Sequence, residues 1–374
     1  MHNWSDADAA VVALTRELVA IPSESGSSNT VICEHLQALL RQGGFEVEWL
    51  QYLDAARQPK VSIVARKGSG HGGAGFFSHI DTVPGQPAEW EPWNPVVKDG
   101  KIYGRASCDM KGPLAATIVA ALRAKTLAKP VVIVITADEE VGFGGATQVA
   151  AESQLLKGNW PDMGVIAEPT RLIPVRAHKG ACQITVTARG VAAHTSMDTG
   201  ISATMLLAPL LAEITEYSRQ FKKDRRFMDA DFQPPTNGFN ITINDGGCPA
   251  NVTAAKTVVQ FNFRTMPAVA TALVKDHICA RAQAHGFEVE TGGWDAVDTP
   301  RSAPVIRLGE QLTGLDAATV PYGTDALVFQ AHVPLLILGP GDIAQAHTIG
   351  EWVEIEQLQR AVPIYEKFIS AVCA

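Results

Sequence analysis

Short runs of apolar residues recur along the chain, and segments with helical spacing separate them. The clearest runs are residues 75–77, 131–135, 163–167 and 335–338. A strand that is apolar on both faces must be covered on both faces, as in a largely parallel sheet flanked by helices. The pattern therefore predicts an α/β fold with such a central sheet.

The segments around these runs alternate between predicted helix and predicted strand. Residues 9–19 have apolar side chains at mostly helical spacing, and Pro22 follows where a helix cannot continue. Thr30 is expected to cap a second helix that ends at Gly43, and a third helix is predicted at residues 113–125. Two further strands are predicted, at residues 45–50 and 61–65.

The middle of the chain has a different pattern. Its first predicted strand alternates apolar and polar side chains, as a half-exposed strand does. The elements that follow complete a β-α-β-β-α-β order, which describes a two-layer α+β unit of about 115 residues. These elements are residues 182–188, 202–221, 239–244, 257–263, 271–284 and 287–290.

The apolar runs resume after Pro300, so the α+β unit is expected to be an insertion into the larger α/β domain. The expected organisation is a first part at residues 1–177, an inserted domain at 178–293, and a second part at 294–374. A chain of 374 residues is long enough for two such domains.

The charge balance excludes several kinds of partner. The chain carries 31 Lys and Arg against 39 Asp and Glu, a formal net charge of −8, which gives no broad attraction to nucleic acid or to an anionic lipid surface. Its apolar runs fall far short of the roughly 20 residues needed to cross a bilayer. The six cysteines include no C-x-x-C pair, and residues 1–6 lack the features of a secretory signal. We therefore expect a cytoplasmic protein with neither a nucleic-acid nor a membrane partner.

Polar side chains follow the apolar runs. His79 and Asp81 come after the first run, three consecutive acids (138–140) after the second, Glu168 after the third and His347 after the fourth. Open α/β sheets bind ligands beyond the carboxyl ends of their strands, so we expect these groups to converge there. In an extended segment, residues 79 and 81 project from one face, which lets the carboxylate hold the imidazole.

The residue types at this edge indicate a metal site. Adjacent acids repel one another unless a cation compensates them, although a solvated loop is the alternative. Asp109 stands in a glycine-containing loop before a predicted helix, where it either caps that helix or binds a ligand. Two histidines and three or four carboxylates without a thiolate suit a pair of zinc-like ions that share a carboxylate and a water.

Other catalytic motifs are absent or lack their structural context. Residues 68–73 match G-x-G-x-x-G, but a strand rather than a helix is predicted next, so we expect a hairpin loop instead of a dinucleotide site. No G-x-x-x-x-G-K-[ST], H-E-x-x-H or G-x-S-x-G occurs. Cys108 is a poor candidate nucleophile, because the neighbouring carboxylate of Asp109 raises its thiol pKa.

Taken in order, these segments resemble a known family of dinuclear metallohydrolases, that of acetylornithine deacetylase, succinyl-diaminopimelate desuccinylase and carboxypeptidase G. The resemblance covers essentially the whole chain and implies a zinc-peptidase-like catalytic domain with an inserted lid and dimerisation domain. The matching segments are residues 78–83, 109–112, 138–140, 168–170 and 346–347.

The resemblance implies two divalent metal ions, zinc or alternatively cobalt. Asp109 would bridge them. His79 and Glu168 would complete the ligands of one ion, and Glu140 and His347 those of the other.

Further roles follow from the same resemblance. Glu139 would be the general base, and Asp81 would orient the histidine two residues before it. His194, in the inserted domain, would stabilise the oxyanion in the partner subunit of a homodimer, with a surface loop histidine as the alternative. Asn251 and Arg264 would lie near the substrate, and the fork of Arg264 suits an α-carboxylate, with a structural ion pair as the alternative.

The expected function is the removal of an acyl group, first of all acetyl, from the α-nitrogen of an amino acid. Residues 168–180 resemble the acetylornithine branch and hence arginine biosynthesis, whereas residues 322–326 resemble the carboxypeptidase and aminoacylase branches. A metallo-carboxypeptidase or dipeptidase, or a hydrolase of other N-acyl amino acids such as a succinyl-diaminopimelate-like substrate, is therefore the alternative. A non-catalytic binding protein on the same fold is a third hypothesis. Such a protein would be expected to have lost metal ligands or the general base, and none of these residues is missing here.

Overall fold

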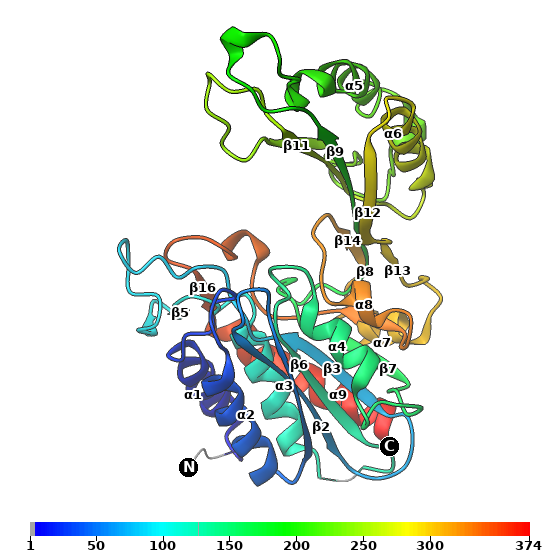
Figure 1. Cartoon of the computed structure of the whole chain (residues 1–374). Coiled ribbons are helices and arrows are strands. Elements are labelled where there is room, and N and C mark those ends of the chain that lie inside the picture. The colour runs from blue at the N-terminus through cyan, green and yellow to red at the C-terminus, as the bar shows by residue number, and fades with distance from the viewer. Residues whose placement is uncertain (1–3, 126) are drawn as a thin grey trace. The chain divides into compact units, whose positions relative to one another are not determined.

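The structure, a computed structural model, describes residues 4–125 and 127–374 and divides the chain into two compact units (Figure 1). The larger unit comprises Met1–Arg176, Thr299–Ala318 and Thr324–Ala374, and the smaller unit comprises Ala177–Asp298 and Thr319–Gly323. The smaller unit is thus formed mainly by the middle of the chain, with one short segment from further along.

The larger unit is built on a mixed sheet, in the strand order β1–β2–β6–β3–β7–β15–β8. Its central strands β6, β3, β7 and β15 are parallel, whereas β1, β2 and β8 pair antiparallel with their neighbours. The predicted parallel arrangement therefore holds for the centre but not for the edges. The strands are β1 (Glu46–Leu53), β2 (Pro59–Lys67), β3 (Ala74–His79), β6 (Val131–Thr136), β7 (Met163–Ile166), β8 (Val175–His178) and β15 (Leu335–Ile337), and β8 also pairs with β13 (Val297–Asp298) and β14 (Ala318–Val320).

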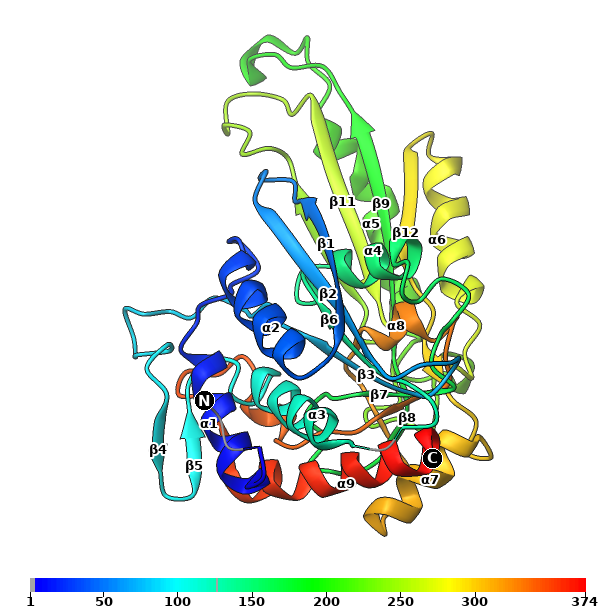
Figure 2. The same ribbon diagram turned by 90° about the horizontal axis from the view of Figure 1, so that it is seen from below.

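Helices cover both faces of this sheet (Figure 2). Helix α3 packs against β3 and is itself covered by α1 and α9, which explains why nearly every residue of α3 is buried. Helices α4 and α8 pack against each other on the opposite face. The helices of this unit are α1 (Ala7–Val19), α2 (Thr30–Gln42), α3 (Lys111–Arg123), α4 (Gly144–Glu152), α7 (Pro304–Thr313), α8 (Ala326–Phe329) and α9 (Ile355–Cys373).

Two local predictions are wrong. Thr30 is the first residue of α2, and the N-cap is Asn29, whose buried side chain instead exchanges two hydrogen bonds with the backbone of Val61 in β2. The glycine-rich loop at residues 68–73 does connect two strands, but β2 and β3 are not neighbours, because β6 lies between them. It is therefore not a hairpin loop.

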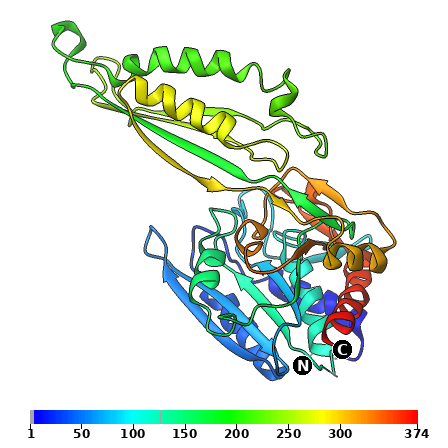
Figure 3. The same ribbon diagram turned by 90° about the vertical axis from the view of Figure 1, so that its right-hand side faces the viewer.

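The smaller unit has the predicted β-α-β-β-α-β order and an antiparallel sheet in the order β10–β11–β9–β12. Alternate residues of β9 are buried, beginning with Cys182, because α5 and α6 cover one face of the sheet (Figure 3). Its strands and helices are β9 (Ala181–Arg189), α5 (Ala203–Ser218), β10 (Asn240–Asn244), β11 (Lys256–Phe263), α6 (Ala272–Ala284) and β12 (Glu288–Trp294), with 3-10 turns η1 (Thr195–Met197) and η2 (Arg225–Phe227).

A small antiparallel sheet in the larger unit joins two distant parts of the chain. Its strand order is β16–β5–β4. Strand β16 (Trp352–Glu354), near the C-terminus, thus pairs with β5 (Lys101–Tyr103), and the loop after β5 leads to α3. The remaining elements are β4 (Val96–Lys98) and the 3-10 turn η3 (Ile343–Gln345). Among the described residues, no helix is long and apolar enough to cross a membrane.

Candidate metal centre

The polar residues of the larger unit that were singled out from the sequence meet at one edge of its sheet. His79 is the last residue of β3, the acids 138–140 follow β6, and Glu168 follows β7 by two residues. These three strands are parallel, so their carboxyl ends lie at the same edge. The loop before α3 brings Asp109 to this edge, and the loop after η3 brings His347.

Asp109 lies between the two histidines. Its Oδ1 is 3.0 Å from Nε2 of His79, and its Oδ2 is 3.2 Å from Nε2 of His347. Each histidine also approaches a second carboxylate: Glu168 Oε1 is 3.8 Å from His79 Nε2, and Glu140 Oε2 is 3.1 Å from His347 Nε2. The five side chains form two groups that share Asp109.

The donor atoms fit a metal ion. Single ligand atoms of His79, Asp109 and Glu140 all lie within 4.8 Å of one another, and ligands around a tetrahedral zinc ion are about 3.3 Å apart. The Nδ1 atom of His79 faces the main-chain oxygen of Asp81 at 3.0 Å, and a carbonyl can only accept a hydrogen bond, so Nδ1 carries the proton. Loss of the proton on Nε2 then leaves a lone pair directed toward the carboxylates, as a metal ligand requires.

The charge of the cluster leads to the same conclusion. His79, Asp109 and Glu168 are at most 6% exposed. Burial, together with the charge of Asp109, raises the pKa of Glu168 well above its ordinary value, and burial has the same effect on the pKa of Glu139. Burial lowers the pKa of His79, but the hydrogen bond with Asp109 and the nearby carboxylates raise it well above its ordinary value. The cluster thus holds more negative charge than its histidines neutralise, and a cation would balance it.

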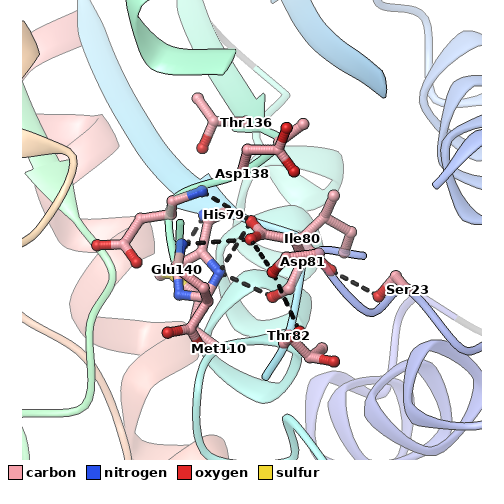
Figure 4. Close-up of polar contacts among 12 residues, drawn as sticks. Ser23, His79, Ile80, Asp81, Thr82, Met110, Thr136, Asp138 and Glu140 are labelled. Atoms are coloured by element: carbon pink, nitrogen blue, oxygen red, sulfur yellow. Dashed lines mark hydrogen bonds and ion pairs between the residues drawn. The ribbon is translucent and has the colours of Figure 1, made fainter. Parts of the chain in front are cut away.

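Asp81 holds the turn that carries the acids. Its carboxylate accepts a hydrogen bond from the backbone N–H of Glu140, at 3.3 Å (Figure 4). It also accepts from the backbone N–H of Glu139, at 3.0 Å, and from the hydroxyl of Ser25, at 2.7 Å. The carboxylate is 3.7 Å from Nδ1 of His79, further away than the main-chain oxygen of the same residue. Asp81 therefore orients the imidazole chiefly through its backbone.

Two residues that the sequence did not indicate, Tyr52 and Lys60, also hold this turn. Asp138 has a left-handed backbone, with φ at 57°, and accepts a 2.6 Å hydrogen bond from the hydroxyl of Tyr52. Lys60, which is buried, lies 3.1 Å from Asp138 and also donates to the main-chain oxygens of Ser25 and Ser27. Tyr52 lies on the edge strand β1 and Lys60 on its neighbour β2, and no local pattern in the sequence marks either of them.

Asp325 is a further buried carboxylate near the cluster. It accepts a hydrogen bond from the hydroxyl of Thr136, the last residue of β6, while its Oδ1 has no hydrogen-bond partner among the described residues. Burial raises the pKa of Asp325 to about 6. From the sequence, this segment served only to compare branches of the family, although the acid itself stands beside the site.

The three predicted site residues of the smaller unit are exposed. His194 and Asn251 lie in adjoining loops, joined by a hydrogen bond from the N–H of Thr195 to the oxygen of Asn251. Arg264 follows the far end of β11, an eight-residue strand that spans about 26 Å. In residues 4–125 and 127–374, Arg264 forms no ion pair with a carboxylate. Within this unit the fold brings His194 and Asn251 together and keeps Arg264 apart from them.

The fold and the buried histidine–carboxylate centre define an α/β protein of the metallopeptidase class. The chain belongs to the Peptidase family M20/M25/M40, whose sequence pattern matches residues 75–371. It is 32% identical over 386 residues to an acetylornithine deacetylase of Myxococcus xanthus, with 99% of each chain covered. The resemblance to the acetylornithine deacetylase and carboxypeptidase family is thereby confirmed.

Solved structures agree on the fold. A tripeptidase from Staphylococcus aureus superimposes with a TM-score of 0.72 at 22% identity, covering 98% of each chain. A dinuclear metal-binding peptidase of the M20 family from Bacillus subtilis superimposes with a TM-score of 0.66 at 14% identity, covering 99% of each chain. Together with the family membership and the deacetylase relatives, the centre described above makes this chain a metal-dependent hydrolase of amide bonds.

Proposed function

We propose that the enzyme removes an acyl group, acetyl first of all, from the α-nitrogen of an amino acid. The observation that carries the proposal is the position of Asp109, which directs one oxygen toward His79 and the other toward His347. Relatives named acetylornithine deacetylase, matched over almost their whole length, make N-acetylornithine the first substrate to test.

Two divalent ions are proposed, with Asp109 shared between them. His79 and Glu168 complete one set of ligands, and Glu140 and His347 complete the other. Imidazole and carboxylate donors without thiolate suit zinc, with cobalt as the alternative. Such ions would polarise the acyl carbonyl and lower the pKa of a bound water molecule.

Glu139 is proposed as the general base. Its backbone N–H is held by Asp81, which fixes the position of the residue. Its carboxylate takes part in no hydrogen bond or ion pair with any other residue that the structure describes, so it is free to accept a proton from water and to pass it to the leaving amine. Glu140, the next residue, is already engaged with His347, and the two neighbours therefore have different tasks.

His194 is proposed to donate a hydrogen bond to the oxyanion. The backbone N–H of Ser196 donates to Nδ1 of His194, so that nitrogen is unprotonated and Nε2 carries the hydrogen. Nε2 is thus a donor, as oxyanion stabilisation requires. Because His194 is exposed on the smaller unit, we assign it to the active site of the partner subunit in a homodimer.

The remaining assignments concern substrate and surroundings. Arg264 is proposed to bind the α-carboxylate with its free guanidinium, and Asn251, which lies beside the His194 loop, to bind the acyl or amide group. Exposed apolar side chains near His194, namely Val191, Met197 and Ile201, favour burial against a second subunit. A cytoplasmic location is the corresponding proposal for the cell.

The test is release of ornithine from N-acetyl-L-ornithine by chelator-stripped protein, before and after zinc or cobalt is restored. Metal-dependent turnover supports the deacylase. Turnover of dipeptides, but of no N-acyl amino acid, would replace it by the second candidate, a carboxypeptidase or dipeptidase. That candidate is favoured by Asp325, which stands beside the centre and lies in the segment that resembles the carboxypeptidase branch. Failure of both substrate classes with two ions bound would overturn the proposed substrate but not the centre.

A further inference from the structure

A second pair of charged residues lies buried behind the proposed centre. Arg105 precedes Asp109 in the loop that leads to α3, and Glu351 immediately precedes β16. The two side chains are each 1% exposed, and Nη1 of Arg105 lies 2.8 Å from Oε2 of Glu351. Burial of an ion pair in itself contributes little to stability, because the loss of hydration offsets the attraction. The contacts of this pair therefore call for another explanation.

Glu351 binds the backbone of the loop that carries Asp109. Its Oε2 accepts the N–H of Ala106 at 2.9 Å, and its Oε1 accepts the N–H of Cys108 at 2.9 Å and that of Asp109 itself at 3.0 Å. Hydrogen bonds to an ionised carboxylate are about twice as strong as those between neutral groups. Glu351 thus holds the backbone of the residue whose carboxylate lies between His79 and His347.

Arg105 connects this loop with two others. Its Nη1 also donates to the main-chain oxygen of Thr348, at 3.1 Å, and its Nη2 donates to that of Pro84, at 3.2 Å. Thr348 directly follows His347, and Pro84 lies in the loop that follows His79 and Asp81. One planar guanidinium therefore joins the three loops that position Asp109, His347 and His79.

We propose that Arg105 and Glu351 form a positioning pair that fixes Asp109 relative to His347 and so sets the affinity for the two metal ions. The inference rests on the ligand assignment proposed above. Partners that hold metal ligands from behind commonly change metal affinity about 10- to 100-fold when they are replaced. The pair contacts the backbone beside both Asp109 and His347, but reaches His79 only through Pro84, five residues away. The ion of the Asp109, Glu140 and His347 set is therefore expected to be the more affected of the two.

The test is Glu351→Gln, which keeps the size of the side chain but presents an NH₂ group where backbone N–H groups now donate. Glu48→Gln is the matched control. Glu48 is also a carboxylate that accepts two backbone N–H groups, from Gln154 at 2.8 Å and Leu155 at 3.3 Å, but it lies on β1 and serves another turn. Zinc or cobalt is titrated calorimetrically into each chelator-stripped protein, and the absorption spectrum of bound cobalt, kcat, KM and the melting temperature are recorded.

We expect Glu351→Gln to weaken one binding step about 10- to 100-fold, to weaken the other step less, and to change the cobalt spectrum. Its kcat should fall while KM changes little, because the ligands rather than the substrate contacts are displaced. Glu48→Gln should lower the melting temperature and leave affinity, spectrum and kcat as in the wild type.

The pair is only structural if Glu351→Gln lowers the melting temperature but binds both ions with wild-type affinity and spectrum. If Glu351→Gln fails to fold, Arg105→Lys is the deciding variant, because it keeps the charge opposite Glu351 but loses the planar guanidinium that reaches Thr348 and Pro84. It should weaken one metal-binding step and alter the absorption spectrum of bound cobalt. Wild-type binding and spectrum in Arg105→Lys would overturn the proposal. Fewer than two bound ions in the wild type would instead contradict the proposed centre, whatever the variants do.

Discussion

The candidate functional residues of the two units differ in how firmly they are held. In the larger unit, Asp109, Asp81 and Asp138 are buried, and each has two or more partners. In the smaller unit, His194 is exposed and its recorded side-chain contacts are with Ser196, two residues away. The first group has its geometry before any ligand arrives. In the smaller unit, the hydrogen-bond donor His194 needs further groups around it to form a binding site, and the proposed partner subunit would supply them.

The largest effect is expected from Glu139→Ala. Removal of the proposed base should lower kcat about 10³-fold, because positioned proton transfer contributes roughly 10²- to 10⁴-fold. Metal content, measured by mass spectrometry of the dialysed protein, should stay at the wild-type value, since Glu139 forms no hydrogen bond or ion pair with a proposed ligand among the described residues. Glu140→Ala is the matched control and should lose metal as well as activity. Loss of metal in Glu139→Ala would move this residue into the ligand set.

His194→Ala tests the exposed side of the comparison. Loss of one oxyanion donor is expected to lower kcat about 10²- to 10³-fold, with zinc affinity unchanged because the ligands lie in the other unit. Size-exclusion chromatography with light scattering should show a dimer, and a monomer alone would end the assignment to a partner subunit.

Mixing the two inactive variants shows which subunit His194 serves. If it acts in the partner's site, a hybrid of Glu139→Ala and His194→Ala chains contains one site with both residues intact, and an equal mixture that re-assembles at random should recover about a quarter of wild-type activity. If His194 acts in its own subunit, every site in the hybrid lacks one of the two residues. The mixture would then stay as inactive as the separate variants.

The ligands were predictable from the sequence, whereas the residues that hold them were not. His79, Glu168 and the acids 138–140 follow apolar strands directly, so chain order and residue type indicate where they meet. Glu351 contacts the loop of Asp109 from 242 positions away in the sequence, and Tyr52 reaches Asp138 from an edge strand 86 residues before it. Such pairings depend on the three-dimensional packing and leave no local periodicity. The predicted N-cap of α2 was wrong for the same reason, because the contact of Asn29 with β2 is tertiary.

A buried histidine on β8, the strand in which the boundary between the two units falls, gives the fold a pH dependence. Burial lowers the pKa of His178, on β8, to about 4 from an ordinary 6.5. As the pH falls below 6.5, His178 takes up a proton in the unfolded chain, but in the folded protein it does so only near pH 4. Its contribution to the free energy of unfolding is therefore fully present above pH 6.5 and is lost as the pH falls from 6.5 to 4. The loss should reach about 3 kcal/mol.

Urea unfolding from pH 4 to 8 measures this loss. The difference between the wild type and His178→Gln isolates this histidine from the acids of the metal centre. His71→Gln, at an exposed position, should leave the pH profile unchanged. A constant difference between the wild type and His178→Gln across the window would show that the folded protein takes up this proton as readily as the unfolded chain, and would contradict the lowered pKa.

The smallest effects come from one hydroxyl in each unit, Tyr52 and Ser196. Tyr52→Phe removes a partly buried hydrogen bond to the carboxylate of Asp138, worth about 1.5–3 kcal/mol, but Lys60 still holds Asp138. We therefore expect kcat to fall about three- to tenfold, with metal content unchanged.

Ser196→Ala removes an exposed hydroxyl from His194 Nδ1, while the N–H of the same residue still donates to that nitrogen and keeps the hydrogen on Nε2. Its effect on kcat should stay below about twofold, since an exposed hydrogen bond competes with water. Steady-state kinetics of the two variants compare the units directly: a larger loss in Ser196→Ala than in Tyr52→Phe would mean that the His194 loop is as buried and as firmly held in the working enzyme as the acid turn.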